Sequence, residues 1–281
     1  PNRVRAVERL EQQVLAQADL TLYVSNQMAA HYEGKYALPP IEHVILPCCV
    51  EAKFFCDRPV RDLPALLSRR TVIGYVGTLA AWQCGPDMLS LFAQLQRRDP
   101  TLFLLLLTPA REHGIALAAA SDAGIQADSI LVREVQHDQV PSYLQHVDIG
   151  LLLRRDHPVN LVSSPTKFAE YLAAGVPVLM TGAVGDYSSQ ARTNRLGFVV
   201  EARKVLSQPV PGEVIDQILA FVHDVRRHRD GWRQRCRDYA RSNLSWDACM
   251  ARLYDRLDLL AAPTESDDLR QTGGCPPVAQ G

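Results

Sequence analysis

Short apolar runs alternate with helix-like segments across residues 71–200, and this alternation restricts the fold more than any other feature of the sequence. The runs are apolar at successive positions, which is typical of strands buried on both faces of a parallel sheet. We therefore predict an α/β fold, a doubly wound parallel sheet of the Rossmann-like type with helices on both faces. The expected strands are TVIGYVG, LFLLLL, SILVRE, DIGLLL, VPVLMT and GFVV, which begin at residues 71, 102, 129, 148, 176 and 197.

Helices are expected between these strands and on both sides of the sheet region. The intervening segments predict helices at residues 86–96, 111–123, 140–146, 166–174 and 187–194. Residues 1–47 predict a helix, a strand, a second helix that Ser25 can cap, and a second strand. Two further helices are expected at residues 213–229 and 232–260.

The composition fits a folded protein that recognises a small or local charged partner. The chain has 281 residues, 47% apolar and 22% charged, enough for one or two domains. Its formal net charge is −1 without blocks of like charge, which argues against nucleic acid as a partner. The longest apolar run, residues 102–107, is too short to span a bilayer, and the N-terminal segment lacks the apolar centre of a signal peptide. We predict a cytoplasmic protein, with peripheral association at the inner face of the membrane as an alternative.

Cysteine usage and known catalytic motifs point to no metal site and no nucleophile. The seven cysteines show neither C-x-x-C nor Cys/His spacing, so reduced thiols are expected rather than disulfides or a zinc site. The motifs G-x-S-x-G and H-E-x-x-H are absent.

The loops that follow the strands carry the candidate binding residues, because ligands of doubly wound sheets bind at the carboxyl ends of the strands. The helix expected from Thr166 exposes unpaired N–H groups, so a phosphate can dock on the backbone of residues 164–167. Lys167 adds a full positive charge, and the Glu170 carboxylate can accept hydrogen bonds from ribose hydroxyls. On spacing alone the alternative is a helix cap at Ser164 and a surface ion pair between Lys167 and Glu170.

Other loop residues have equally simple alternatives. Gly77 and Gly85 permit a ligand to approach closely, but their spacing matches neither a dinucleotide fingerprint nor a P-loop. Arg154 and Arg155 can meet a diphosphate or pair with Asp156.

Four more residues lie in these loops. Asp186 can contact a ligand or cap the helix that follows it, and Trp82 can stack on a base or sugar or cover the sheet edge. His137 and His157 are interpreted as solvated.

Several segments together add information that spacing alone does not provide. They are ADLTLYVSNQMAAHY, VILPCCVEAKFF, GYVGTLAAWQCG, VPSYLQHVDIGLLLRRD, SSPTKFAEYLAAGVPV, GDYSSQ and NRLGFVV. In this order and spacing, residues 18–260 resemble the carboxyl-terminal, donor-binding half of family 4 retaining GT-B glycosyltransferases. SPTKFAEYLAAGVPV is the most specific segment.

The resemblance implies two Rossmann-like domains, with a nucleotide-sugar donor bound mainly by the second and an acceptor by the first. Glu170 would bind the donor ribose, residues 164–167 the diphosphate, and residues 132–137 the base, with no metal or other cofactor. The donor-binding residues predicted from the loops and the resemblance are Ser164, Pro165, Thr166, Lys167, Glu170, Gly77, Thr78, Arg154, Arg155, Val135 and Gln136.

The resemblance also suggests a division of the chain. Residues 1–47 would be a remnant of the first domain, its last helix–strand–helix portion, and residues 48–70 a connecting segment. The donor-binding domain would occupy residues 71–243, a closing helix residues 244–262, and a disordered tail residues 263–281.

The sequence departs from the family pattern at positions that carry charge. Many members have a second glutamate eight residues before the position of Glu170, where this chain has Val162. Many have an arginine and a lysine after the first strand of the donor domain, where this chain offers Thr78 and Gln83. Losing one charge-assisted contact of this type costs ~1.5–3 kcal/mol.

The expected function is transfer of a sugar from a nucleoside diphosphate to a glycan or lipid-linked acceptor, with retention of configuration. The alternatives are a non-catalytic nucleotide-binding or interaction module and a GT-B sugar epimerase. With most of the first domain missing, Trp246, Leu253 and Leu257 are expected to be exposed, so we predict self-association or poor solubility.

Overall fold

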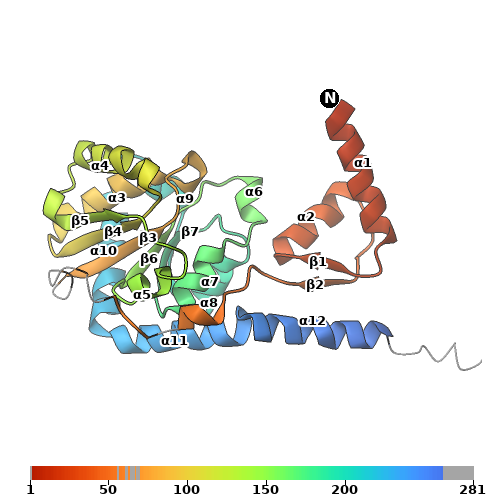
Figure 1. Cartoon of the computed structure of the whole chain (residues 1–281). Helices are drawn as coiled ribbons and strands as arrows, with labels where there is room; N and C mark the ends of the chain where they lie inside the picture. Colours follow the sequence, from red (N-terminus) through yellow and green to blue (C-terminus); the bar gives the residue numbers. More distant parts are fainter. Residues whose placement is uncertain (1, 56, 61–62, 64–66, 68–69, 262–281) are drawn as a thin grey trace, which may run out of the picture.

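The computed structural model describes residues 2–55, 57–60, 63, 67 and 70–261. The predicted tail at residues 263–281 lies outside the described residues, as does part of the predicted connecting segment. The described chain forms a large α/β unit, which is joined to a small N-terminal unit by an extended segment and by one long helix (Figure 1).

The large unit contains the parallel six-stranded sheet that the alternation predicts. Its strand order is β5-β4-β3-β6-β7-β8, and each pair of neighbours is parallel. The strands are β3 (Thr71–Val76), β4 (Leu102–Leu107), β5 (Ile130–Arg133), β6 (Ile149–Leu152), β7 (Val178–Thr181) and β8 (Gly197–Val200). This order runs outward from β3 in one direction and from β6 in the other, which is the doubly wound Rossmann-like arrangement.

Two apolar cores cover the two faces of the sheet. Side chains alternate along β4, so Leu104 faces one core and Leu105 the other. Each expected helix between the strands is present, and α10 packs with α3 on one face while α7 packs with α11 on the other. The helices are α3 (Gly85–Arg98), α4 (His113–Asp122), α5 (Val140–Leu144), α7 (Thr166–Ala173), α8 (Tyr187–Thr193) and α10 (Gly212–Arg227). Short helices that the sequence did not predict are α6 (Pro158–Leu161), α9 (Ala202–Val205), and the 3₁₀ helices η3 (Ala81–Gln83), η4 (Ala110–Glu112) and η5 (Ala127–Ser129).

The N-terminal unit has the predicted order of elements. Its two strands pair in parallel, and Ser25 caps the second helix as expected, with its hydroxyl accepting from the Met28 N–H at 3.0 Å. The elements are α1 (Asn2–Gln17), β1 (Thr21–Tyr23), α2 (Asn26–Tyr36) and β2 (His43–Ile45), followed by the 3₁₀ helix η1 (Ala52–Phe55).

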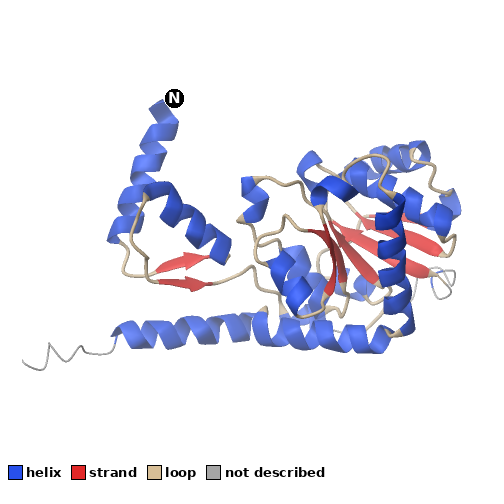
Figure 2. Cartoon of the chain, turned by 180° about the vertical axis from the view of Figure 1, so that it is seen from behind, coloured by secondary structure: helices blue, strands red, loops and turns tan. Residues whose placement is uncertain are grey.

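The single helix expected at residues 232–260 is instead two helices. α11 (Arg229–Asn243) ends where Leu244 accepts a hydrogen bond from the Val50 N–H at 2.8 Å, and Ser245 then caps α12 (Trp246–Ala261). The connecting segment pairs with the chain between the two helices, and this pairing interrupts the helix. Beyond the break, α12 runs past the large unit and under the N-terminal unit (Figure 2).

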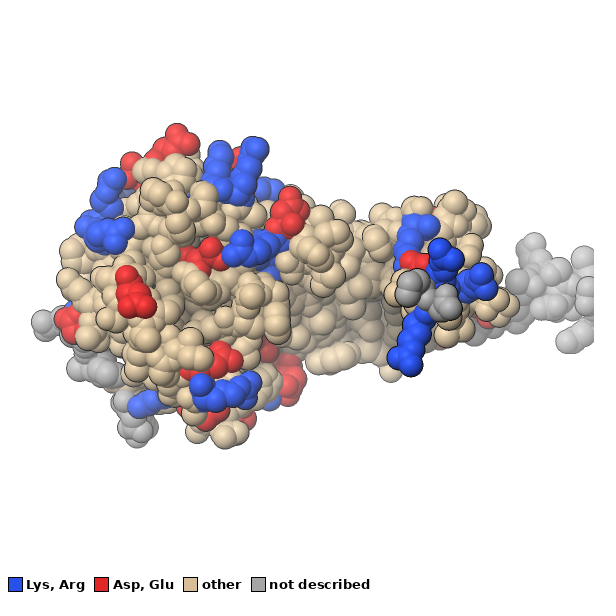
Figure 3. Space-filling model, turned by 90° about the horizontal axis from the view of Figure 1, so that it is seen from above, with Lys and Arg blue, Asp and Glu red and all other residues tan. Residues whose placement is uncertain are grey.

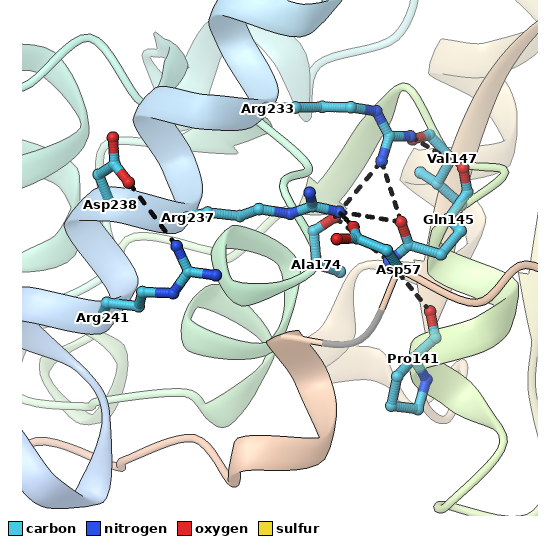
Figure 4. Close-up of polar contacts among 9 residues, drawn as sticks. All are labelled: Asp57, Pro141, Gln145, Val147, Ala174, Arg233, Arg237, Asp238 and Arg241. Atoms are coloured by element: carbon cyan, nitrogen blue, oxygen red, sulfur yellow. Dashed lines mark hydrogen bonds and ion pairs between the residues drawn. The ribbon is translucent and has the colours of Figure 1, made fainter.

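Arginines on α11 attach it to the large unit (Figure 4). Arg233 donates to the carbonyls of Gln145 and Val147 at 2.9 and 3.0 Å, and Arg237 donates to the Ala174 carbonyl at 3.4 Å. These carbonyls follow the last turns of α5 and α7, where helices leave acceptors unpaired. The arginines therefore fix the far end of α7, whose first turn carries the candidate site.

The described helices and the charges on one face of the large unit bear on the kind of partner the chain can bind. Within the described residues, no helix has both the length and the apolar character needed to cross a membrane. Acidic and basic side chains are interspersed over the large unit when it is viewed from above (Figure 3). The prediction that Leu253 is exposed was wrong, since it is 8% exposed, whereas Trp246 and Leu257 are exposed.

Candidate functional site

The candidate site lies where the order of the strands reverses, at the carboxyl ends of β3 and β6. The connections leaving two neighbouring strands diverge there, one toward β4 and the other toward β7. A crevice at this point is the usual ligand site of doubly wound sheets. The loops after β3 and β6 and the first turn of α7 meet there.

Lys167 lies over the end of β3. Its Nζ donates to Gln83 Oε1 at 3.0 Å and lies 5.3 Å from the centre of the Tyr75 ring. Gly77 makes this position possible, because a Cβ on Gly77 would lie 2.7 Å from Lys167 Nζ. Gly77 also has a φ of +134°, which favours glycine.

Lys167 and Arg154 are neighbouring cations, of which Arg154 is buried and Lys167 is half-buried. Burial and then the nearby Arg154 charge lower the pKa of Lys167 to about 8. Arg154 is 5% exposed, and burial lowers its pKa as well. Its Nη1 donates to the Leu153 carbonyl at 2.9 Å, and among the described residues neither cation forms an ion pair with a carboxylate. Because uncompensated buried charge is unfavourable, this arrangement is typical of a site that receives an anion.

The start of α7 adds hydrogen-bond donors beside these cations. Pro165 is the N-cap residue and makes no side-chain capping bond, so the first N–H groups of Thr166 and Lys167 lack partners within the helix. Ser164 is not the cap that one alternative expected. Its buried hydroxyl accepts from the Cys48 N–H at 2.9 Å and lies 2.7 Å from the Tyr187 hydroxyl. Ser164 therefore shapes the turn, and its side chain is already engaged.

Glu170 does not pair with Lys167, which contradicts the surface ion-pair alternative. Its carboxylate lies 3.4 Å from His137 Nε2, and its side chain is 14% exposed. Burial raises the pKa of Glu170, while the contact with His137 opposes that rise. A half-buried carboxylate one turn along α7 from Lys167 can accept hydrogen bonds from a diol.

His137 was interpreted as solvated, and its side chain is indeed 58% exposed, but it also contacts residues of the site. Its Nδ1 lies 3.1 Å from Lys53 Nζ, on the connecting segment, and its ring is 5.5 Å from the ring of Phe54. Since the Lys53 ammonium only donates, Nδ1 accepts and Nε2 carries the proton toward Glu170. The position of His137 at the carboxyl end of β5 was the one signal in the sequence for this role.

A cavity of about 190 Å³ continues from this site. Of the two residues predicted here to bind the donor, Val135 lines this cavity, whereas Gln136 is exposed and lies outside the wall. The wall consists of Val76, Gly77, Leu107, Thr108, Pro109, Glu134, Val135, His137 and Val140. A mainly apolar cavity with a few polar groups suits a flat aromatic ring.

Two other residues predicted to bind the donor already have hydrogen-bond or ion-pair partners within the protein. Thr78 lies in the loop after β3, where its carbonyl accepts from the Tyr75 hydroxyl at 2.5 Å. Arg155 is half-exposed and pairs with Asp87 Oδ2 at 2.7 Å, so the alternative pairing with Asp156 was wrong.

Asp186 joins the N-terminal unit to the large unit. Its carboxylate makes no capping bond to its own helix and accepts from the backbone N–H and the side-chain amide of Asn26 at 2.7 and 2.8 Å. It also accepts from the Gln27 N–H at 3.3 Å, and the neighbouring Ser25 donates to the Val162 carbonyl at 2.8 Å. Asp186 therefore supports the start of α2 from across the unit boundary, a role that neither alternative included.

Solved structures share this fold at low sequence identity. Sucrose-phosphate synthase from Thermosynechococcus elongatus is 20% identical with a TM-score of 0.66, covering 92% of this chain and 63% of the synthase. The carboxyl-terminal domain of the group 1 family glycosyl transferase LpcC from Francisella tularensis is 14% identical with a TM-score of 0.52, covering 70% of this chain and 99% of that domain. HepE from Anabaena, in complex with UDP and glucose, is 12% identical with a TM-score of 0.66, covering 90% of this chain and 67% of HepE.

These similarities establish the fold and leave the activity to be argued from the site. No protein-family model and no curated protein matches the chain. The chain spans less than two thirds of the length of the synthase. It has the Rossmann-like α/β fold that its GT-B glycosyltransferase neighbours share.

Proposed function

We propose that the chain is the donor-binding half of a family 4 retaining glycosyltransferase, which moves a sugar from a nucleoside diphosphate to a glycan or lipid-linked acceptor. The observation that carries this proposal is the half-buried Lys167 beside the buried Arg154, neither of them with a carboxylate partner among the described residues. A diphosphate would supply the missing negative charge and would also accept from the first N–H groups of α7.

The surroundings of the cations fit the rest of a nucleotide. Glu170 lies one turn further along α7, where it would accept from the two ribose hydroxyls. The 190 Å³ cavity beside Gly77 would hold the base. The donor needs no additional cofactor in this arrangement. The acceptor would bind mainly to a first domain that includes residues 1–47, at the cytoplasmic face of the membrane.

The same groups would act on the reaction itself. When the bond between sugar and diphosphate breaks, negative charge develops on the leaving phosphate. Lys167, Arg154 and the N-terminal end of α7 are fixed in place before that charge appears, so they stabilise the transition state more than the ground state.

Calorimetric titration with UDP, GDP and ADP tests donor binding directly. We expect one diphosphate to bind, and Lys167→Ala to weaken that binding by about tenfold or more, since a charged hydrogen bond contributes ~1.5–3 kcal/mol. Glu170→Ala should weaken it as well. Lys204→Ala is the matched control, because Lys204 is half-exposed and, within the described part of the chain, its ammonium pairs with Glu201 alone, at 3.1 Å. The proposal fails if none of the three diphosphates binds, or if Lys167→Ala and Glu170→Ala bind like the control.

A non-catalytic nucleotide-binding module is the second candidate. The observation that favours it is the neutral Gln83 carboxamide beside Lys167, where many family members carry a cation. Val162, where many members carry a second glutamate, offers no polar side chain, and its polar contacts are those of its backbone, including the carbonyl that accepts from Ser25. Sugar release from UDP-, GDP- or ADP-sugars above the uncatalysed rate would exclude this candidate. Diphosphate binding without such release would favour it over transfer.

A further inference from the structure

The loop after β3 exposes an aromatic ring beside the donor site. Trp82, in η3, is 64% exposed and is the most exposed of the three tryptophans in the chain. Tryptophan has one of the largest apolar surfaces of any side chain, so an exposed tryptophan lacks the favourable free energy that burying this surface would give. Such an exposed ring is available to stack on a ligand.

The loop after β6 faces this ring and completes a pocket of about 460 Å³. Val159, which is 66% exposed, adds a second apolar surface. The pocket is lined by Ala81, Trp82, Arg155, Asp156, His157, Val159 and Asn160. Its volume lies within the range of small-molecule sites, ~300–1,000 Å³.

Polar atoms next to these apolar surfaces can still form hydrogen bonds with a ligand. His157 Nδ1 accepts from the Val159 N–H at 3.3 Å, and the Asn160 amide donates to the Arg155 carbonyl at 2.8 Å. Among the described residues, His157 Nε2, Asn160 Oδ1 and the Asp156 carboxylate have no hydrogen-bond partner. The pocket therefore combines an apolar platform with free donors and acceptors around it.

We infer that this pocket binds a sugar ring, an inference that rests on the proposed function and extends it. A pyranose has a face of C–H groups, which packs on an indole ring, and a rim of hydroxyls, which needs donors and acceptors. Both requirements are met here by different residues: the ring face by Trp82 and Val159, the rim by the polar groups of the loop after β6.

The pocket is joined to the proposed phosphate site through neighbouring residues. Gln83 follows Trp82 and bonds to Lys167, and Arg155 follows the buried Arg154. The ion pair between Arg155 and Asp87, 2.7 Å, ties the loop after β6 to the start of α3. A ring on Trp82 thus lies next to the position of the diphosphate, where either the donor sugar or the terminal sugar of an acceptor would be placed.

Fluorine NMR of the chain labelled with 5-fluorotryptophan tests this inference. Trp82→Phe assigns the Trp82 signal among the three. The labelled protein is titrated with UDP, with UDP-glucose, GDP-mannose and ADP-glucose, and with methyl glycosides and short oligosaccharides of common hexoses. We expect sugar-containing ligands to move the Trp82 signal and to leave the signal of the exposed Trp246 unchanged.

Variants separate stacking from a general loss of structure. Trp82→Ala should weaken the sugar-dependent part of binding about tenfold, equivalent to ~1.4 kcal/mol, while Trp82→Phe retains most of it. Trp246→Ala, which removes another exposed tryptophan, should leave binding unchanged. Affinity for UDP without a sugar should be the same in all three variants.

The titrations also identify the source of the sugar. A shift with nucleotide sugars but not with free saccharides assigns the pocket to the donor sugar, and a shift with free saccharides assigns it to the acceptor. If no sugar of either kind moves the Trp82 signal while a diphosphate binds, the inference is overturned and the proposed function stands. If no diphosphate binds, the proposed function fails on its own, and the saccharide titrations still decide the pocket.

Discussion

Replacing Lys167 with methionine is expected to stabilise the free protein while removing donor binding. Methionine has a similar length and no charge, so it keeps the packing against Gly77 and removes the half-buried cation. Burial lowers the pKa of Lys167 to about 8. Against an ordinary lysine value of ~10.4, the charged form is disfavoured by ~3 kcal/mol, at 1.36 kcal/mol per tenfold change in proton affinity. Relaxation and the lost bond to Gln83 reduce the net gain to about 1–2 kcal/mol.

The pH dependence of this difference follows from the direction of the shift. Below pH 8 both the folded and the unfolded wild type carry the Lys167 proton, and the full penalty is present. Between pH 8 and ~10.4 the folded state has lost this proton and the unfolded state still binds it, so wild-type stability rises with pH relative to the variant. The advantage of Lys167→Met should therefore be greatest near pH 7 and should shrink steadily above pH 8.

Urea unfolding of both proteins between pH 7 and pH 10 measures this difference. Groups common to both proteins cancel in the comparison, and Lys204→Met controls for the loss of a lysine in general. The reasoning is refuted if Lys167→Met is less stable than the wild type at pH 7, or if the gap between them does not change with pH. Titration with diphosphate at pH 7 should show the opposite preference, with the wild type binding at least tenfold more tightly.

Three further predictions test other parts of the site. Glu170→Gln should reduce the preference for UDP over 2′-deoxy-UDP in calorimetric titrations; an unchanged preference would remove the ribose role. Gly77→Ala should cost ~1–3 kcal/mol of stability because of the positive φ, and should weaken diphosphate binding by displacing Lys167, whereas Gly114→Ala, in an open helical position, should be neutral or stabilising. Asp186→Ala should speed hydrogen exchange at the start of α2 about fivefold, as expected for a lost cap worth ~1 kcal/mol, and equal exchange rates would show that the contact contributes nothing.

The fold could be predicted because its determinants are local. Continuous apolar runs of strand length, separated by helical segments, leave few arrangements besides a covered parallel sheet. The break between α11 and α12 had a weaker signal, since neither glycine nor proline occurs at residues 243–246 and only Ser245, a residue type that favours helix N-caps, marks it. There the backbone of Val50, almost 200 residues earlier, pairs with Leu244 and Ser245, and this pairing separates the two helices.

The site was partly predictable, because the positions of its residues relative to the strands can be read from local sequence. The rule that ligands bind at the carboxyl ends of strands placed Lys167, Arg154 and Gly77 at one edge, and they do meet there. Side-chain partners were not predictable, because they come from distant segments. His137 meets Glu170 across 33 positions, and Asp186 meets Asn26 across 160. Single-sequence patterns carry no information about such pairs.

The contacts of the phosphate turn link it to the N-terminal unit. The turn before α7 is held by Ser164, whose hydroxyl accepts from the N–H of Cys48, at the start of the connecting segment, and meets Tyr187 next to Asp186. Asp186 in turn holds the start of α2. A diphosphate that orders the N–H groups at the start of α7 therefore acts on the same turn that supports the unit boundary. Donor binding should then slow hydrogen exchange at the start of α2 as well as at α7, and Ser164→Ala should uncouple the two; protection confined to α7 in the wild type would show that the two units respond independently.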